Sequence, residues 1–269
     1  DITELLSAQR KAAWADVARR IAHEIKNPLT PIQLSAERLR RKYLKQITED
    51  PDTFSNCTDT IVRQVEEIGR MVDEFSSFAR MPQATLKNEN LSDICRQGVI
   101  LERNRHPEID YNVELPEESI TLRCDSRQIG QALTNLLKNA AESVSARLLE
   151  EGDKTAKGQI GCSLKEKSDG HGGTFVSIII ADNGLGLPKA EREKLTEPYV
   201  TSREGGTGLG LAIVKKIMED HHGDIILADN DQGGATITLL FHPSEDTEDD
   251  NNNQTDPMKT ATGLLDHGS

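Results

Sequence analysis

The sequence predicts a two-part chain in which a long helical hairpin is followed by an α/β sandwich. Residues 1–82 carry apolar side chains at seven-residue spacing, which is typical of packed helices. From about residue 87 to residue 243, strand and helix patterns alternate between glycine-rich turns. The length of 269 residues allows about two domains. We therefore expect a helical domain over 1–82, an α/β domain over 83–243 and an acidic, disordered tail over 244–269.

A first helix is expected from about Thr3 to Ile47. Its apolar residues form two seven-residue series offset by four, the pattern of a face that packs on other helices. These series are Ala18, Ile25, Ile32 and Leu39, and Ala22, Leu29, Ala36 and Tyr43. Pro28 and Pro31 fall in the helix interior, where each removes a hydrogen bond at a cost of roughly 3 kcal/mol, so we expect a bend there.

His23 lies outside both series, roughly 130° from the centre of the apolar face at about 100° per residue. We expect it in water, with Glu24 beside it and Asn27 one turn further on. An ordinary exposed histidine is the alternative, but strain beside a polar cluster is more often functional. A neutral imidazole that attacks a phosphoryl group must lose a proton, and an adjacent carboxylate can take it.

A second helix is expected over about Asn56–Arg80, after a loop at Glu49–Ser55. Its apolar residues alternate at spacings of four and three. They are Ile61, Val65, Ile68, Val72, Phe75 and Ala79. Met81 and Pro82 end the helix, and the linker to Leu86 can serve as a hinge. Two helices with a continuous seam cannot bury it alone, so we expect a homodimer whose hairpins form a four-helix bundle.

Asn135 and Asn139 lie four residues apart in a third helical pattern, so both amides share one face. The apolar positions of this helix include Ile129, Leu133, Leu136, Leu137 and Ala140. Amide oxygens are neutral ligands for a hard cation already bridged to a triphosphate. The polar, glycine-rich stretch 152–173 is expected to be a long loop.

The β-branched strand Ser177–Ala181 runs directly into Asp182, and Gly184 and Gly186 follow. A carboxylate there can accept from an exocyclic amine while glycine backbone passes close to a flat ring. A second glycine-rich run, 205–210, opens a helix that continues to about Asp220 and can present N–H groups to phosphate. Each motif is weak alone, since a Gly-x-Gly is commonly a turn; their order along the chain carries the inference.

Residues 22–33 resemble the phosphoacceptor box of the two-component sensor histidine kinases, and the longer run 13–43 is most similar to nitrogen-regulation kinases of the NtrY type. The resemblance implies that His23 is the phosphorylated nucleophile and that Glu24 is its acid/base. It also implies that Asn27 positions a water for dephosphorylation of the partner.

The downstream motifs resemble the ATP-binding domain shared by histidine kinases, type II topoisomerases, Hsp90 chaperones and MutL proteins, and the whole resemblance covers about residues 4–243. It implies that Asn139 ligates Mg²⁺, that Asn135 and Lys138 flank the phosphates and that Asp182 reads the adenine amine. The remaining implied site residues shape the base pocket, close over the phosphates or support the adenine contact. They are Gly184 and Gly186, then Gly206, Thr207, Gly208, Leu209 and Gly210, and finally Thr236.

The segment 197–203 stands where the kinases carry a lid, usually rich in phenylalanine. Tyr199 occupies the aromatic position, a mild departure from the family pattern. Arg203 is a candidate contact to the γ-phosphate because its charge is fixed, and a solvated arginine is the alternative.

Composition excludes other classes. The net charge of −13 argues against a nucleic-acid surface, and the sequence has no P-loop motif. The cysteines show no metal-binding spacing and are expected to be isolated reduced thiols; they are Cys57, Cys95, Cys124 and Cys162. His221 and His222 are expected at the surface, with Gly223 as a helix cap.

The sequence thus predicts an ATP- and Mg²⁺-dependent kinase that phosphorylates His23 and passes the phosphoryl group to an aspartate of a response regulator. By resemblance, the regulator is of the NtrX type, the kinase also has phosphatase activity toward it, and the chain is the cytoplasmic portion of a membrane-anchored bacterial kinase. Two alternatives remain open. One is an ATP-driven conformational machine with the same nucleotide fold, and the other is a non-enzymatic dimerising scaffold.

Overall fold

The structure is a computed structural model that describes residues 2–152, 156–168, 174–189, 192–201 and 206–242, with side chains from residue 17 onward. The expected tail therefore lies outside the described residues. The elements in chain order are α1 (Ile2–Tyr43), α2 (Pro51–Ala79), β1 (Lys87–Asn90), α3 (Leu91–Arg105), β2 (Ile109–Glu114), β3 (Thr121–Cys124), α4 (Ser126–Glu151), β4 (Gly158–Ser168), β5 (Thr174–Asp182), η1 (Arg192–Thr196), α5 (Gly210–Asp220), β6 (Gly223–Asp229) and β7 (Ala235–Phe241).

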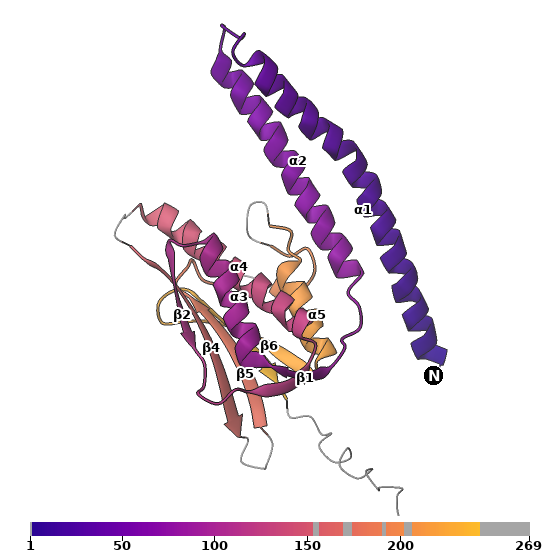
Figure 1. Cartoon of the computed structure of the whole chain (residues 1–269), viewed down its shortest axis with the longest axis vertical. Coiled ribbons are helices and arrows are strands. Elements are labelled where there is room, and N and C mark those ends of the chain that lie inside the picture. The colour runs from indigo at the N-terminus through magenta and orange to yellow at the C-terminus, as the bar shows by residue number, and fades with distance from the viewer. Residues whose placement is uncertain (1, 153–155, 169–173, 190–191, 202–205, 243–269) are drawn as a thin grey trace, which may run out of the picture.

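The two expected helices form a hairpin that projects from the α/β unit (Figure 1). Helix α1 continues through Pro28 and Pro31 and changes direction along its length in the picture. Helix α2 begins at Pro51, five residues before the expected start. The earlier start follows from local chemistry, because the Asp50 carboxylate accepts from the Thr53 N–H at 3.2 Å and proline is favoured at the first helical position.

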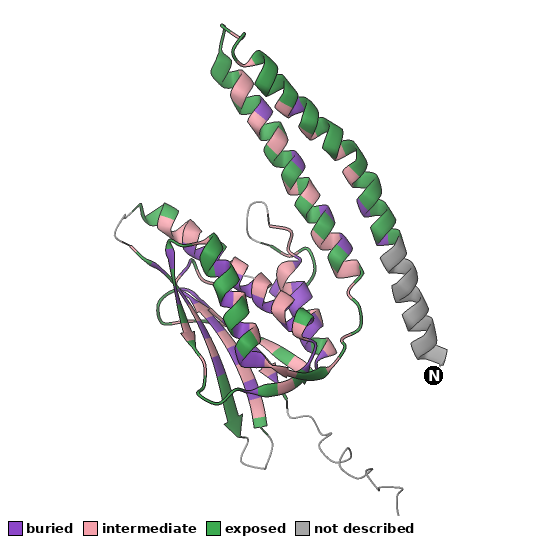
Figure 2. Ribbon diagram, in the orientation of Figure 1, coloured by how far each residue is buried: buried purple, intermediate pink, exposed green. Residues whose placement is uncertain are grey.

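Small residues line the contact between α1 and α2. Ala18, Ala22 and Ala36 are buried, and they face α2 where Val65 and Val72 are also buried. The larger members of the seam stay substantially exposed in the single chain, as the mostly green and pink hairpin of Figure 2 shows. They include Ile25, Ile32, Leu39, Ile61 and Ile68. None of the described helices combines the length and the apolar composition that a membrane crossing requires.

A five-stranded sheet in the order β2-β4-β5-β7-β6 forms the α/β unit, and helices α3, α4 and α5 lie together on one of its faces (Figure 1). Strands β2 and β4 are parallel, and the other pairs are antiparallel. Strands β1 and β3 form a separate antiparallel pair. One apolar core between sheet and helices holds all the expected apolar positions of α4. The predicted sandwich is therefore confirmed.

The expected loop over 152–173 is wrong, because β4 (Gly158–Ser168) occupies half of it. Ile160, Cys162 and Leu164 alternate inward and are buried, while their outward neighbours are polar. This strand lies between β2 and β5, so its polar face does not prevent it from completing the sheet. The four cysteines are free thiols, as expected. A hydrogen bond with Cys162 and burial raise the pKa of the Cys95 thiol.

His221 is buried rather than at the surface, and this corrects a second expectation. Its Nε2 accepts from the Asp125 N–H at 2.9 Å, and its Nδ1 donates to the Ile217 carbonyl at 2.7 Å. The left-handed residue after α5 is His222, with φ of 54°, so Gly223 is not the cap and instead begins β6. His221 thus joins the end of α5 to the start of α4.

Replacing His221 by leucine should destabilise the α/β unit by about 1–3 kcal/mol, because the buried Asp125 N–H would lose its acceptor. His222→Asn is the matched control, since asparagine tolerates the left-handed backbone and the side chain is exposed. Urea unfolding of both variants measures the difference. Equal stability of His221→Leu and the control would show that the buried hydrogen bonds contribute nothing net.

Candidate functional site

The candidate phosphoacceptor segment lies on the exposed surface of α1. His23, Glu24 and Asn27 are all exposed, as the heptad analysis predicts. The Glu24 carboxylate accepts from Nε of Arg20 at 2.9 Å, one turn earlier on the same helix. Exposed ion pairs of this kind are weak, so Glu24 is free to reorient toward the ring of His23. Sequence reasoning did not single out Arg20.

Asp182 ends β5 and points into the core side of the sheet, where it is only 7% exposed. Its Oδ1 accepts from the Gly184 N–H at 2.8 Å and from the Ala235 N–H at 3.4 Å. Its carbonyl oxygen accepts from Asn230 Nδ2 at 2.7 Å. These contacts fix a buried carboxylate between two strand ends, which is the position that the sequence assigns to adenine recognition.

Glycines surround this carboxylate because side chains would not fit there. A Cβ at Gly184 would lie 2.3 Å from Ser143 Oγ, and one at Gly234 would lie 1.9 Å from the Asp182 carbonyl oxygen. Gly186 has φ of +75°, and a Cβ on it would meet the Gly233 carbonyl at 2.7 Å. The backbone therefore packs at close range around Asp182, and only glycine fits at these three positions.

Thr236 and Asp182 point to opposite faces of the sheet. It pairs with Ala181, and residues opposite each other on antiparallel strands point to the same face. Asp182 is the next residue along β5 and therefore faces the opposite way. Ala235 shares that face with Asp182 and supplies the N–H that its carboxylate accepts. The supporting role of Thr236 at the adenine therefore stays a prediction.

Asn139 of α4 lies at the start of α5. A Cβ on Gly210 would be 3.5 Å from Asn139 Nδ2, so the asparagine motif and the second glycine-rich motif meet in space. Asn135 Nδ2 is buried and has no hydrogen-bond partner among the described residues. Helix α5 begins without a side-chain cap, so its first N–H groups are available to an anion. The N–H groups at the start of α5 are donors of the kind that bind phosphate.

The glycine-rich segment just before α5 presents its backbone, and not the Leu209 side chain, at the start of that helix. The Leu209 side chain is buried in the core, and its N–H donates to Thr207 Oγ1 at 3.3 Å. Only backbone atoms of Leu209 can therefore contact a phosphate. Lys138 is half-exposed, and its Nζ lies 3.9 Å from a carboxylate oxygen of Glu142 one turn on. Gly206 and Gly208 are both half-buried.

The lid segment is anchored where it meets the glycine-rich run. The Tyr199 N–H donates to the Gly208 carbonyl at 3.0 Å. A Cβ on Gly208, where φ is +67°, would lie 2.6 Å from the Tyr199 carbonyl carbon. Tyr199 itself has φ of 66° and an exposed ring, so its ring does not pack as a lid in this structure. Arg203 lies outside the described residues.

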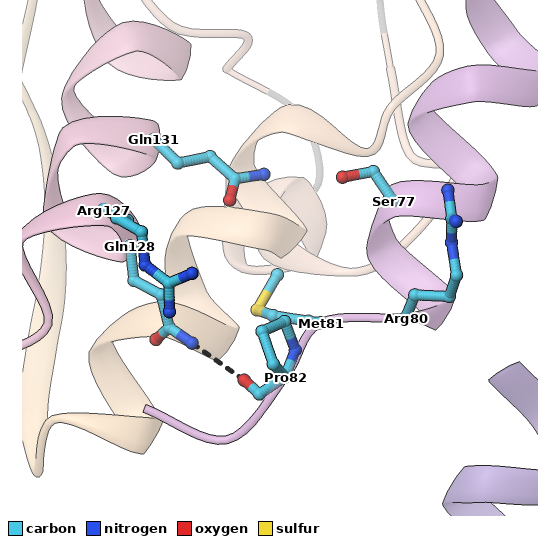
Figure 3. A pocket seen from close by; sticks show the side chains of 7 residues that line it. All are labelled: Ser77, Arg80, Met81, Pro82, Arg127, Gln128 and Gln131. Carbon is cyan, nitrogen blue, oxygen red and sulfur yellow. Dashed lines mark hydrogen bonds between the residues drawn. The ribbon is translucent and has the colours of Figure 1, made fainter. Parts of the chain in front are cut away.

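A pocket separates the end of α2 from the start of α4, and Figure 3 shows its lining side chains. Gln128 Nε2 donates to the Pro82 carbonyl at 2.8 Å, and the Thr85 N–H donates to Asp125 Oδ2 at 3.0 Å. Although burial opposes ionisation, hydrogen bonds from Thr85, Arg127 and Gln128 hold the pKa of Asp125 below its usual value. Two hydrogen bonds therefore hold the linker after α2 against the start of α4.

Two family models match the chain. Residues 13–84 match the His Kinase A (phospho-acceptor) domain, and residues 124–245 match the Histidine kinase-, DNA gyrase B-, and HSP90-like ATPase. The Nitrogen regulation protein NtrY of Azorhizobium caulinodans is 56% identical over 90% of this chain and 30% of its own length. The chain belongs to the NtrY-type sensor histidine kinases.

Other relatives of this histidine kinase agree with that membership. A putative sensor histidine kinase NtrY-like of Rickettsia bellii is 39% identical over 90% of this chain and 37% of its own. The chain thus spans about a third of the length of these curated relatives. Full-length ShkA, solved in complex with AMPPNP, matches with a TM-score of 0.60 at 20% identity over 85% of this chain and 46% of its own, which shows a shared fold.

Several residues that support the nucleotide site of this histidine kinase were missed from the sequence. Asn230 holds the Asp182 carbonyl and also accepts from the Gly234 N–H at 3.0 Å. Ser143 Oγ accepts from the Leu185 N–H at 3.0 Å, which holds the loop after β5 against α4. The glycine pair at 233–234 was the available signal for Asn230, since a tight turn commonly needs a side-chain acceptor.

Proposed function

We propose that the chain binds ATP beside Asp182, phosphorylates His23 and passes the phosphoryl group to an aspartate of a response regulator. The observation that carries the proposal is the meeting of Asn139 with Gly210 at the uncapped start of α5, because it joins two motifs that lie far apart in the sequence. Within the same chain, α1 presents the exposed His23 in the matched phosphoacceptor domain. A buried carboxylate that can accept from the adenine amine, and N–H donors for phosphate, are groups that ATP binding uses.

The proposed reaction moves one phosphoryl group. A ring nitrogen of neutral His23 attacks the γ-phosphorus, a nitrogen–phosphorus bond forms, and the bond to the β–γ bridging oxygen breaks to release ADP. Glu24 orients the imidazole and takes the ring proton. In the second step, the aspartate oxygen of the regulator attacks the same phosphorus and His23 is regenerated. Asn27 then holds a water for dephosphorylation of that aspartate.

Asn139 is the residue that would hold Mg²⁺, through its amide oxygen. Within the described part of the chain, no group of three or more histidine, cysteine, aspartate or glutamate side chains comes together to bind a metal. A single neutral ligand suits Mg²⁺, which keeps waters and substrate phosphate oxygens as its other ligands. When bound, the ion neutralises charge on the phosphates.

Dimerisation and the regulator belong to the same proposal. The exposed seam that includes Ile25, Ile32 and Ile68 would be covered by a second hairpin in a four-helix bundle. Resemblance to the family supports an NtrX-type regulator, nitrogen regulation and a cytoplasmic position within a membrane-anchored kinase. It also supports the boundary between a helical domain over 1–82 and an ATP-binding domain over 83–243.

Incubation with γ-labelled ATP and Mg²⁺ tests the central step. We expect label on the protein that is lost in acid and retained in base, as phosphohistidine requires, and no label when the metal is chelated. Hydrolysis of ATP with no labelled protein would favour an ATP-driven conformational machine. Failure to bind ATP at all would favour a non-enzymatic scaffold.

Glu24→Ala and Asn27→Ala should separate two activities of one helix surface. Glu24→Ala should lower the rate of autophosphorylation by the roughly 10²–10⁴-fold typical of a lost general base. Asn27→Ala should leave that rate largely intact and slow the dephosphorylation of a phosphorylated regulator. Label accumulation and regulator dephosphorylation are the two measurements. If Asn27→Ala lost kinase activity as severely as Glu24→Ala, Asn27 would instead be maintaining the proline-containing helix.

A further inference from the structure

One carboxylate of the helical hairpin reaches into the candidate phosphate end of the ATP site. Glu74 lies in the last turns of α2, and its Oε1 is 3.6 Å from Nζ of Lys138 on α4. Its other oxygen, Oε2, accepts a hydrogen bond from the hydroxyl of Thr207. Glu74 therefore bridges a helix and a glycine-rich segment that belong to the α/β unit, across the boundary between the two matched domains.

The chemistry of this contact resembles that of a phosphate group. A carboxylate offers two anionic oxygens, and ammonium and hydroxyl groups donate to it as they would to a phosphate. Lys138 and Thr207 are two of the residues that the resemblance to the family places beside the phosphates of ATP. In this structure both of them contact Glu74. Lys138 forms an ion pair with it, and Thr207 donates a hydrogen bond to it.

Packing around Glu74 holds it in this position. Phe75, Phe78 and Met81 are partly buried and pack against the core of the α/β unit. Gln128 fixes the linker just beyond them through the Pro82 carbonyl. The contact is thus one point of a local docking of α2. In Figure 1 this docked α2 stands between α1 and the α/β unit, so the helix that carries His23 lies away from the site.

We propose that Glu74 is an internal anion that competes with the phosphates of ATP for Lys138 and Thr207. This inference rests on the proposed function of those two residues. Entry of the triphosphate removes both partners from Glu74 and weakens the docking of α2, which frees the α/β unit to approach His23. Because coupling is reciprocal, the docked arrangement lowers the affinity for ATP by the same factor.

Glu74→Gln tests the competition, because it removes the charge while keeping the size of the side chain. Titration calorimetry with ATP should show about 3–10-fold tighter binding than wild type, the range for loss of one partly exposed ionic competitor. Adenosine carries the base that Asp182 is proposed to recognise but has no phosphates, so its affinity should not change. Glu67→Gln is the matched control, since Glu67 lies seven residues earlier on α2 and accepts a bond only from Gln64 among the contacts described for it.

Each other outcome is decisive. Unchanged ATP affinity in Glu74→Gln, with adenosine bound normally, would overturn the competition and leave the proposed function intact. An equal gain for ATP and adenosine would also overturn it, because Glu74 would then act on the docking of α2 and not on the phosphate donors. Absence of ATP binding by the wild-type chain would overturn the proposed function itself.

Discussion

His23→Gln is expected to abolish autophosphorylation to background while ATP binding is retained. The glutamine amide is not a nucleophile that can carry a phosphoryl group, so no intermediate can form at this position. The nucleotide residues lie on α4, β5 and the segment before α5, and His23 lies on the exposed surface of α1. Labelling with γ-labelled ATP and calorimetric titration with ATP measure the two properties separately.

The matched control is His242→Gln, which changes another exposed histidine, one that pairs with Asp224 at 2.7 Å. This variant should be labelled as wild type is. Label that persists in His23→Gln at the wild-type level would end the assignment of His23. Loss of ATP binding in His23→Gln would indicate that the hairpin contributes to the nucleotide site.

Gly234→Ala is expected to have the largest effect on nucleotide binding among single changes outside the candidate ligands. The new Cβ would lie 1.9 Å from the Asp182 carbonyl oxygen and 2.9 Å from Asn183 Cα. Both obstacles are backbone atoms, so the strand end must move, and overpacking of this kind costs about 1–3 kcal/mol. Since Asp182 moves with it, we expect ATP affinity to fall at least about tenfold, which corresponds to about 1.4 kcal/mol.

Gly161→Ala on β4 provides the control. A Cβ there meets only the Ala181 carbonyl, at 3.9 Å, which is ordinary contact. Thermal unfolding and ATP titration of both variants should show a lower melting temperature and weaker binding for Gly234→Ala alone. Wild-type ATP affinity in Gly234→Ala would mean that the close approach of β7 to Asp182 is not needed for binding.

Local patterns made much of the fold and of the site predictable. The four-residue spacing of Asn135 and Asn139 places both on one helix face whatever packs around them, and the structure places Asn139 beside the start of α5. Asp182 follows a strand of β-branched residues, so its place at a strand end could also be derived. The heptad series likewise located the hairpin and kept His23 exposed.

Features that depend on distant partners could not be derived. Strand β4 has a polar outer face and resembles a loop until β2 and β5 are placed beside it. His221 is buried because Asp125, 96 residues away, supplies a donor. The face of the sheet on which Thr236 lies follows from its pairing with Ala181, which the sequence of one strand alone does not specify. No sequence pattern indicated the contacts of Glu74, since its partners Lys138 and Thr207 lie in the other matched domain.

The small-residue contact between α1 and α2 has a consequence for how the kinase responds to dilution. Because the larger apolar residues of the hairpin face outward, most of the stabilisation available to the hairpin comes from the second copy in the proposed dimer. The α/β unit has its own apolar core and needs no such partner. If the proposed dimer forms, thermal melting of the hairpin should shift with protein concentration, whereas melting of the ATP-binding unit should not. Rates measured in very dilute samples would then describe a chain whose phosphoacceptor helix is partly melted.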